Sequence, residues 1–282
     1  MKIVFFGLNE FGFESLKKLI ENKFIIGMAV IPINNKNKNL IRLVKQNRIK
    51  LFLFNNNLED LKKEIFKIKP ALIIISSFNK ILPSDIIYFP KLGSINIHPS
   101  LLPKYRGAHP INWALINGEK KTGVTIHYVN EKADDGEIIT QKSLLISDND
   151  DINTLKNKLA KLGGQLLVKV IKKIKKTKGK LPSTKQDSRL VTLAPKRTPE
   201  QGRIDWKKRS KEIFNLVRAL KTPLPNAFSY KNNVRIEFFD NFISNRAGEV
   251  IAKVKGFYLI TTTDGLILLK TKQKLNIGDI LN

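Results

Sequence analysis

The sequence has no cysteine in its 282 residues. Disulfide bonds, thiolate zinc sites and cysteine nucleophiles are therefore excluded, and a reducing compartment such as the cytoplasm is expected. Long apolar runs are also missing. The first apolar stretch ends at Gly7, so it is too short for a signal segment or a membrane span. The sequence thus predicts a cytoplasmic protein with no membrane span.

Acidic residues are scarce: 24 Asp and Glu stand against 51 Lys and Arg, which gives a formal net charge of +27. Such a charge suits a polyanionic partner such as RNA, DNA or an anionic lipid surface. Compositional drift gives the same charge, and an even spread of lysine in a chain rich in Asn and Ile is typical of it. We favour drift and expect no DNA partner, because nucleic-acid sites also use the arginine fork. The densest run, residues 172–180, closes a predicted helix, where cations suit the helix dipole.

Strand and helix patterns alternate over the first 148 residues. Apolar runs of strand length occur at residues 2–7, 25–31, 50–54, 71–76 and 93–98, and helical spacing separates them at residues 10–22, 39–47 and 58–68. Residues 124–129 and 136–141 form a closing pair of strand-like runs. This alternation predicts an α/β fold with a Rossmann-like, mostly parallel sheet and helices on both faces.

The second half of the chain has a different pattern. Residues 151–176 carry an apolar residue at every third or fourth position, which predicts one long helix. A polar stretch with three prolines follows, and residues 204–220 again have helical spacing. Strand-like runs then occur at residues 227–230, 234–239, 248–254, 257–263 and 265–271, as in a small β-barrel. We expect a large domain of residues 1–180, a linker of residues 181–204 and a smaller OB-like β-barrel domain of residues 205–282.

Two polar side chains project from the end of one predicted strand. Asn96 and His98 are two residues apart, so they face the same side. An amide donor beside an imidazole can polarise a carbonyl and stabilise an oxyanion. Asp134 stands in a turn before another predicted strand, where a carboxylate can orient an imidazole or accept a proton. Taken singly, these features are explained equally well by a strand cap and a hairpin turn.

The stretches INIHPSLLPKYRG, GEKKTGVTIHYV and ADDGEIITQ occur in this order, and the arrangement resembles the 10-formyltetrahydrofolate-dependent formyltransferases. The resemblance extends over the whole chain and is most specific over residues 96–136. It implies that residues 1–180 are a folate-binding catalytic domain and that Asn96, His98 and Asp134 are the catalytic triad. It also implies 10-formyltetrahydrofolate as the co-substrate and no metal. The family's usual Leu-Asp-Thr-Gly-Asp reads Ala-Asp-Asp-Gly-Glu here, which bears on the substrate subgroup more than on activity.

The same resemblance implies two sets of binding residues. The folate pocket would be lined by Ser77, Phe78, Ile81, Leu82, Leu102, Asp135 and Gly136. The amine substrate would meet Pro99, Ser100, Lys104, Arg106, Gly107 and Arg218, with Lys104 or Arg218 facing a phosphate. His127 lies inside a predicted strand with no partner signal, and we interpret it as structural.

Two primary amines are candidates for the acceptor. Methionyl-tRNA formyltransferases act on initiator tRNA, but their basic insertion after the second strand is absent from the short connection at residues 33–39. Nucleotide-linked 4-amino sugars are the other candidate. SLLPKYRG and RTPEQGRIDW resemble the formyltransferase domain of the bifunctional enzyme that makes 4-amino-4-deoxy-L-arabinose, and we favour this acceptor. A non-catalytic RNA-binding protein on the same fold is a further alternative, which the intact triad disfavours.

Overall fold

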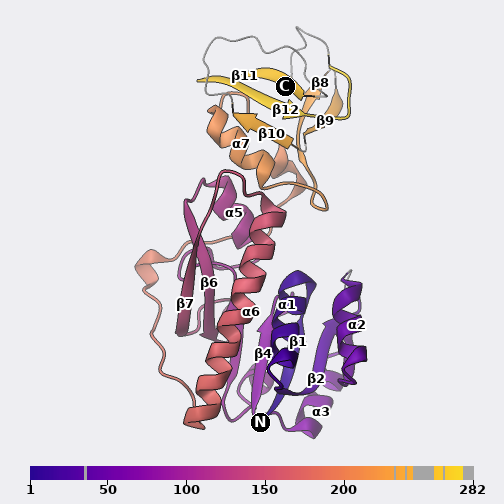
Figure 1. The fold of residues 1–282 in the computed structure, drawn as a ribbon, viewed down its shortest axis with the longest axis vertical. Coiled ribbons are helices and arrows are strands. Elements are labelled where there is room, and N and C mark those ends of the chain that lie inside the picture. The colour runs from indigo at the N-terminus through magenta and orange to yellow at the C-terminus, as the bar shows by residue number, and fades with distance from the viewer. Residues whose placement is uncertain (35–36, 232, 239, 244–256, 263, 276–282) are drawn as a thin grey trace. The chain divides into compact units, whose positions relative to one another are not determined.

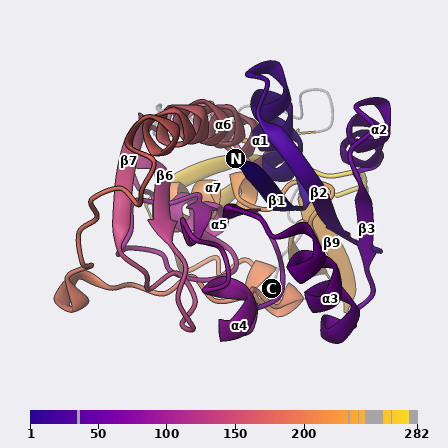
Figure 2. The ribbon, with the colours of Figure 1, turned by 90° about the horizontal axis from the view of Figure 1, so that it is seen from below.

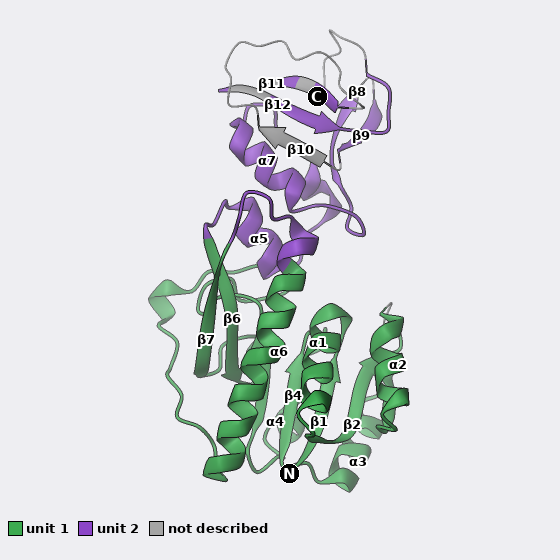
Figure 3. Ribbon diagram, viewed as in Figure 1, with its two compact units in different colours: residues 1–108, 121–145, 156–194 green, residues 109–120, 146–155, 195–282 purple. Residues whose placement is uncertain are grey.

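The computed structural model describes residues 1–34, 37–231, 233–238, 240–243, 257–262 and 264–275 (Figure 1). The chain divides into two compact units (Figure 3). The first unit comprises residues 1–108, 121–145 and 156–194, and the second comprises residues 109–120, 146–155 and 195–282. The chain therefore enters the second unit three times. The linear boundaries at residues 180 and 204 stay a prediction.

The first unit is built on a seven-stranded sheet in the order β3-β2-β1-β4-β5-β6-β7. Neighbours from β3 to β5 pair in parallel, whereas β6 and β7 run antiparallel. The mostly parallel sheet expected from the sequence is thereby confirmed. The strands are β1 (Lys2–Gly7), β2 (Ile25–Pro32), β3 (Leu51–Phe54), β4 (Leu72–Ser76), β5 (Ser94–His98), β6 (Lys121–Tyr128) and β7 (Ile138–Leu145).

Helices cover both faces of this sheet. The α-helices that do so are α1 (Asn9–Glu21), α2 (Lys38–Gln46), α3 (Leu58–Ile68), α4 (Ser84–Ile87) and α6 (Ile152–Thr177), and a short 3₁₀ turn lies at Ser188–Leu190. Figure 2 shows α1, α2 and α6 over one face and α3 and α4 over the other. On the α3/α4 face, strand residues such as Phe6 and Ile73 pack with Leu61 and Ile86 of the helices. Burial on both faces is why these strands read as continuous apolar runs.

The second unit consists mainly of strands, as the sequence predicted. Its helices are α5 (Pro110–Ile116), α7 (Ser210–Arg218) and a 3₁₀ turn at Pro199–Gly202. Its strands are β8 (Ala227–Lys231), β9 (Val234–Phe238), β10 (Asp240–Ile243), β11 (Phe257–Thr262) and β12 (Gly265–Lys270). They form a two-stranded sheet, β8-β9, and a three-stranded sheet, β10-β12-β11. The expected strand at residues 248–254 lies outside the described residues.

One predicted helix is shorter than its sequence pattern. Residues 204–220 were expected to be helical, but α7 begins at Ser210. The amide of Ile204 donates to the carbonyl of Phe228 at 2.7 Å, and the indole of Trp206 donates to Ser229 at 2.9 Å. Contacts with β8 therefore hold the first residues of this stretch outside the helix, and a turn at residues 205–208 leads into α7. Within the described part of the chain, no helix is both long enough and apolar enough to span a bilayer.

Candidate active site

Strand β5 separates apolar from polar side chains by simple alternation. Ile97 points towards α6, where Gly163 packs against it. Asn96 and His98 are out of phase with Ile97 and face the α3/α4 side of the sheet. The register agrees, since Asn96 lies beside Ile75, which belongs to the core cluster on that side. The two polar residues thus share one face, as the sequence predicted.

Asp134 joins them from the turn between β6 and β7. Its backbone has a φ of 53°, which turns the side chain back over the sheet. One carboxylate oxygen, Oδ1, lies 3.1 Å from Asn96 Nδ2 and 3.3 Å from His98 Nδ1. The other, Oδ2, accepts the backbone N–H of Gly107 at 3.0 Å. The three residues predicted to form the triad therefore meet around one carboxylate.

His127 is a fourth member of this cluster. Its Nε2 lies 3.1 Å from Asn96 Nδ2 and 3.5 Å from Asp134 Oδ1. The sequence pattern did not indicate these partners, and the interpretation of His127 as structural stays a prediction. The antiparallel pairing of β5 and β6 places His127 directly opposite Asn96. Alternation along both strands could have indicated this contact, but only with the register known.

The proton positions on the two histidines follow from their backbone partners. His98 Nε2 lies 2.8 Å from the carbonyl of Tyr105, and His127 Nδ1 lies 2.7 Å from the carbonyl of Tyr128. A carbonyl only accepts, so each of these nitrogens carries a hydrogen. In its neutral form His127 then has Nε2 free to accept from Asn96. The Asn96 amide consequently donates one hydrogen to His127 and the other to the carboxylate.

The electrostatics of the cluster favour an ionised carboxylate. The side chain of Asp134 is 13% exposed, and burial alone would raise its pKa. The interactions with His98 and His127, chiefly the positive charge of His98, outweigh burial and hold the pKa of Asp134 far below its usual value. A buried carboxylate beside an imidazole can orient that ring, stabilise its cationic form and accept a proton from an attacking nucleophile.

The loop after β5 is held rigidly by its own polar groups. The hydroxyl of Ser100 donates to the carbonyl of Lys104 at 2.6 Å, and Thr125 donates to the carbonyl of Ser100 at 2.7 Å. Thr125 also accepts the N–H of Leu102 at 3.1 Å. Ser100 is therefore buried, and its hydroxyl is hydrogen-bonded within the loop. Lys104 is exposed and Pro99 is half-buried.

Residues 181–194, which we call the strap, bind back onto the site loops. Gln186 accepts from Arg106 Nε at 3.0 Å and donates to the carbonyls of Asp134 and Gly136, each at 2.8 Å. Arg106 also forms an ion pair with Asp135. The N–H of Ala194 donates to the carbonyl of Arg106 at 2.7 Å, and the N–H of Arg106 donates to the carbonyl of Thr192 at 2.9 Å. The polar stretch expected to be a linker thus fixes the turn that carries Asp134.

The residues predicted to bind folate lie in different environments. The Phe78 ring packs edge-on against Phe6 at 5.1 Å, and Leu82 and Leu102 are each only 3% exposed. Ile81 is 67% exposed and stands free for a ligand. The remaining members, Ser77, Asp135 and Gly136, lie at the ends of β4 and in the β6–β7 turn. The sequence alone could not distinguish apolar side chains that line a pocket from those that fill the core.

Arg218 is placed in the second unit, apart from the other predicted residues. It is 3% exposed, and its guanidinium donates to Asn215 at 3.0 Å and to the carbonyls of Ser147 and Asp150 at 2.9 and 3.2 Å. These contacts hold segments of that unit together. Its contact with a substrate phosphate stays a prediction.

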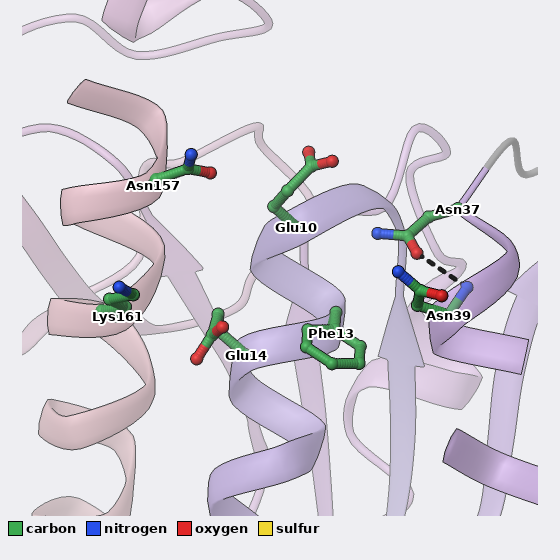
Figure 4. A pocket seen from close by; sticks show the side chains of 7 residues that line it. All are labelled: Glu10, Phe13, Glu14, Asn37, Asn39, Asn157 and Lys161. Atoms are coloured by element: carbon green, nitrogen blue, oxygen red, sulfur yellow. Dashed lines mark hydrogen bonds between the residues drawn. The ribbon is translucent and has the colours of Figure 1, made fainter. Parts of the chain in front are cut away.

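A separate hollow of about 320 Å³ opens on the other helical layer of the first unit (Figure 4). Side chains from α1, α6 and the start of α2 surround it, namely Glu10, Phe13, Glu14, Asn37, Asn39, Asn157 and Lys161. Because α1 and α6 lie on the face opposite to His98, this hollow is distinct from the cluster around Asp134. In the described residues no group of three or more His, Asp or Glu is arranged to hold a metal ion.

A doubly wound sheet with a buried amide, imidazole and carboxylate at a strand end is typical of group-transfer enzymes. The family comparison makes the class specific. The model of the Formyl transferase family matches residues 1–171, and the model of the Formyl transferase C-terminal domain matches residues 196–282. The chain therefore belongs to the formyl transferase family, whose members are enzymes that use 10-formyltetrahydrofolate.

Relatives with two kinds of name resemble the chain. It is 36% identical to the methionyl-tRNA formyltransferase of Fusobacterium nucleatum over 100% of this chain and 96% of the relative. It is 38% identical to the bifunctional polymyxin resistance protein ArnA of Wigglesworthia glossinidia brevipalpis over 86% of this chain and 38% of the relative. An N-formyltransferase of Helicobacter canadensis, solved with folinic acid and dTDP-3-aminofucose, has a TM-score of 0.77 at 22% identity and covers 96% of this chain and 98% of that one. This last likeness shows the fold alone.

Proposed function

We propose that the protein transfers the formyl group of 10-formyltetrahydrofolate to the amino group of methionyl initiator tRNA. The observation that supports formyl transfer is the meeting of Asn96 and His98 around the Asp134 carboxylate. The acceptor is inferred from the full-length relatives, because the Fusobacterium nucleatum methionyl-tRNA formyltransferase matches this chain from end to end. We place the reaction in the cytoplasm on account of the cysteine-free sequence.

The geometry suggests how the chain's own groups take part. The formyl carbonyl lies against Asn96 and His98, and its oxygen replaces His127 as acceptor of one Asn96 amide hydrogen. The amine attacks the formyl carbon, and the amide and the imidazolium of His98 stabilise the oxyanion. Asp134 orients His98 and accepts the proton that the amine loses. The bond from carbon to folate N10 then breaks, and N10 takes up a proton.

Folate is proposed to lie over the turn that carries Asp134. Ile81 offers the exposed apolar side chain on which a pterin ring can rest. Asp135 and Gly136 form the floor, and Gly136 has no room for a side chain because a Cβ would lie 1.7 Å from the carbonyl of Tyr128. The strap keeps this floor in place through Gln186.

An amino-sugar acceptor is the second candidate. The 38% identity to ArnA of Wigglesworthia glossinidia brevipalpis supports it, as does the short connection between β2 and α2. The chain covers 38% of that relative. This candidate is kept because the motifs around Arg106 suit both acceptors.

The test is a direct comparison of acceptors. The protein is incubated with 10-formyltetrahydrofolate and either methionyl initiator tRNA or a panel of nucleotide-linked 4-amino sugars. Formylmethionyl-tRNA is the expected product, and formylation of a sugar alone would reverse the assignment. His98→Ala should abolish transfer, while the matched exposed-strand variant Lys142→Ala on β7 should leave it unchanged. Failure with every amine would contradict formyl transfer itself.

A further inference from the structure

The basic charge of the chain is concentrated in one segment. Residues 152–186 contain eleven lysines and neither Asp nor Glu. This segment therefore carries +11 of the formal charge of +27. Most of it is helix α6, so the arrangement of these lysines follows from helical geometry.

Helix α6 has one buried and one basic side. Its apolar residues Leu159, Leu167, Ile171 and Ile174 are completely buried. Exposed lysines occupy the opposite side, and most of them are three or four residues apart. We call this set the lysine stripe: Lys161, Lys169, Lys172, Lys173 and Lys176. With a rise of 1.5 Å per residue, the stripe is about 22 Å long.

The stripe lacks the counter-charges found on other helices of the first unit. On α1, Lys18 pairs with Glu21 at 2.7 Å, and on α3 Glu64 pairs with Lys50. Among the described residues, no carboxylate lies within 4 Å of a stripe lysine. Like charges at these spacings repel and lower helix stability. Drift would spread lysine along the chain, and it gives no reason for eleven lysines without one acid between residues 152 and 186.

We propose that the lysine stripe binds the phosphate backbone of RNA. Lysines in a row neutralise successive phosphates and release their counterions, which gives affinity without sequence preference. A lipid surface is a poorer partner, because none of the large apolar side chains of α6 is among the exposed ones that could enter a bilayer. This inference corrects our reading of the charge as drift alone.

The stripe lies outside the site proposed for formyl transfer. Gly163 of α6 packs against Ile97 and Val124, so α6 covers the face of the sheet opposite to Asn96 and His98. An RNA on the stripe therefore does not contact the cluster around Asp134 from this face. The inference adds a binding surface to the proposed function and does not depend on the identity of the acceptor.

The test removes equal charge in two places. The stripe variant replaces four lysines by glutamine, at Lys169, Lys172, Lys173 and Lys176. The matched control does the same at exposed, unpaired positions elsewhere in the first unit, at Lys2, Lys45, Lys67 and Lys91. Both variants lose four charges, so an effect of net charge alone would be equal in both. Binding to fluorescently labelled tRNA is measured by anisotropy without folate, over a series of KCl concentrations.

The stripe variant should bind tRNA about tenfold or more weakly at 0.1 M KCl, and the slope of log Kd against log salt should fall by about 3. The control should change by less than about threefold. Equal losses in the two variants, or no binding by the wild-type protein, would overturn the proposal. A loss seen on phosphatidylserine vesicles but not on tRNA would assign the stripe to a membrane instead.

The outcomes separate this proposal from the proposed function. Binding of tRNA without any formyl transfer would leave the stripe intact and refute the transfer reaction. If the stripe variant instead transfers formyl to methionyl-tRNA with an unchanged KM and binds tRNA with unchanged anisotropy, the transfer reaction is supported and the role of the stripe is refuted. Circular dichroism of the two variants checks that α6 remains folded.

Discussion

Replacement of Asp134 by asparagine tests the cluster most directly, because the shape is kept and the charge is removed. The new amide oxygen can still accept the N–H of Gly107, which turns the NH₂ group towards His98 Nδ1. His98 already uses the hydrogen on Nε2 for the carbonyl of Tyr105. Its Nδ1 then has to accept, so we expect the ring to be held neutral in the Asp134→Asn variant.

The loss of rate follows from the interactions removed. The wild-type carboxylate supports the imidazolium of His98 and, in the proposed mechanism, the proton lost by the amine. Each charge-assisted hydrogen bond contributes about 1.5–3 kcal/mol, so two give about 3–6 kcal/mol. At 1.4 kcal/mol per factor of ten, the transfer rate should fall by about 10²–10⁴. Single-turnover formyl transfer measures the rate, and ¹⁵N NMR of the His98 ring reports its protonation. A folded variant that keeps more than about a tenth of the rate would refute the reasoning.

The same substitution should also change how the free energy of unfolding depends on pH. The pKa of Asp134 is depressed in the folded protein, so its carboxylate stabilises the fold above its unfolded pKa of about 4, and this contribution is lost as the pH falls further. Asp134→Asn should therefore lower the free energy of unfolding by about 1–3 kcal/mol at pH 7. The difference from wild type should narrow below about pH 4. Urea unfolding of both proteins at pH 7 and pH 3 measures this difference in the free energy of unfolding. A difference that is larger at pH 3 would contradict the depressed pKa of Asp134.

Three further substitutions have distinct expected results. His127→Phe keeps a ring but removes the acceptor that orients Asn96 before substrate binds, a neutral hydrogen bond of about 0.5–1.5 kcal/mol, so kcat/KM should fall about threefold to tenfold; an unchanged kcat/KM would mean that Asn96 needs no support. Gly136→Ala should raise the Kd for folate, measured by calorimetry, because the new methyl group would clash with the carbonyl of Tyr128. Arg218→Met removes three buried hydrogen bonds and should lower the free energy of unfolding by about 2–4 kcal/mol in a urea titration.

Much of the fold could be predicted because its signals are local. Apolar runs buried on both faces identified β1 to β5, and the regular spacing from residue 151 onward identified α6 to within one residue at each end. The helix expected at residues 204–220 failed at its start for a non-local reason. Pairing of Ile204 with Phe228 of β8 decides that path, and no pattern within the segment reveals it.

In the candidate site, too, local features could be predicted and contacts between distant segments could not. Asn96 and His98 could be placed together because they share one strand. His127 could not, since its contact with Asn96 depends on the register between β5 and β6. Phe78 was expected in the folate pocket, but apolar residues that line a pocket and those that fill a core have the same chemistry. Phe78 packs on Phe6 and is half-buried, so its place in the folate pocket stays a prediction.

The strap has a consequence for how the protein is made. The turn with Asp134 is anchored by Gln186, some fifty residues further along, and the Arg106 loop by Ala194. A ribosome releases these anchors only after every strand of the large sheet has emerged. The sheet can therefore form early while the reactive groups are still loosely held. A chain truncated near residue 180 would keep every strand of the large sheet and yet lack a finished catalytic centre.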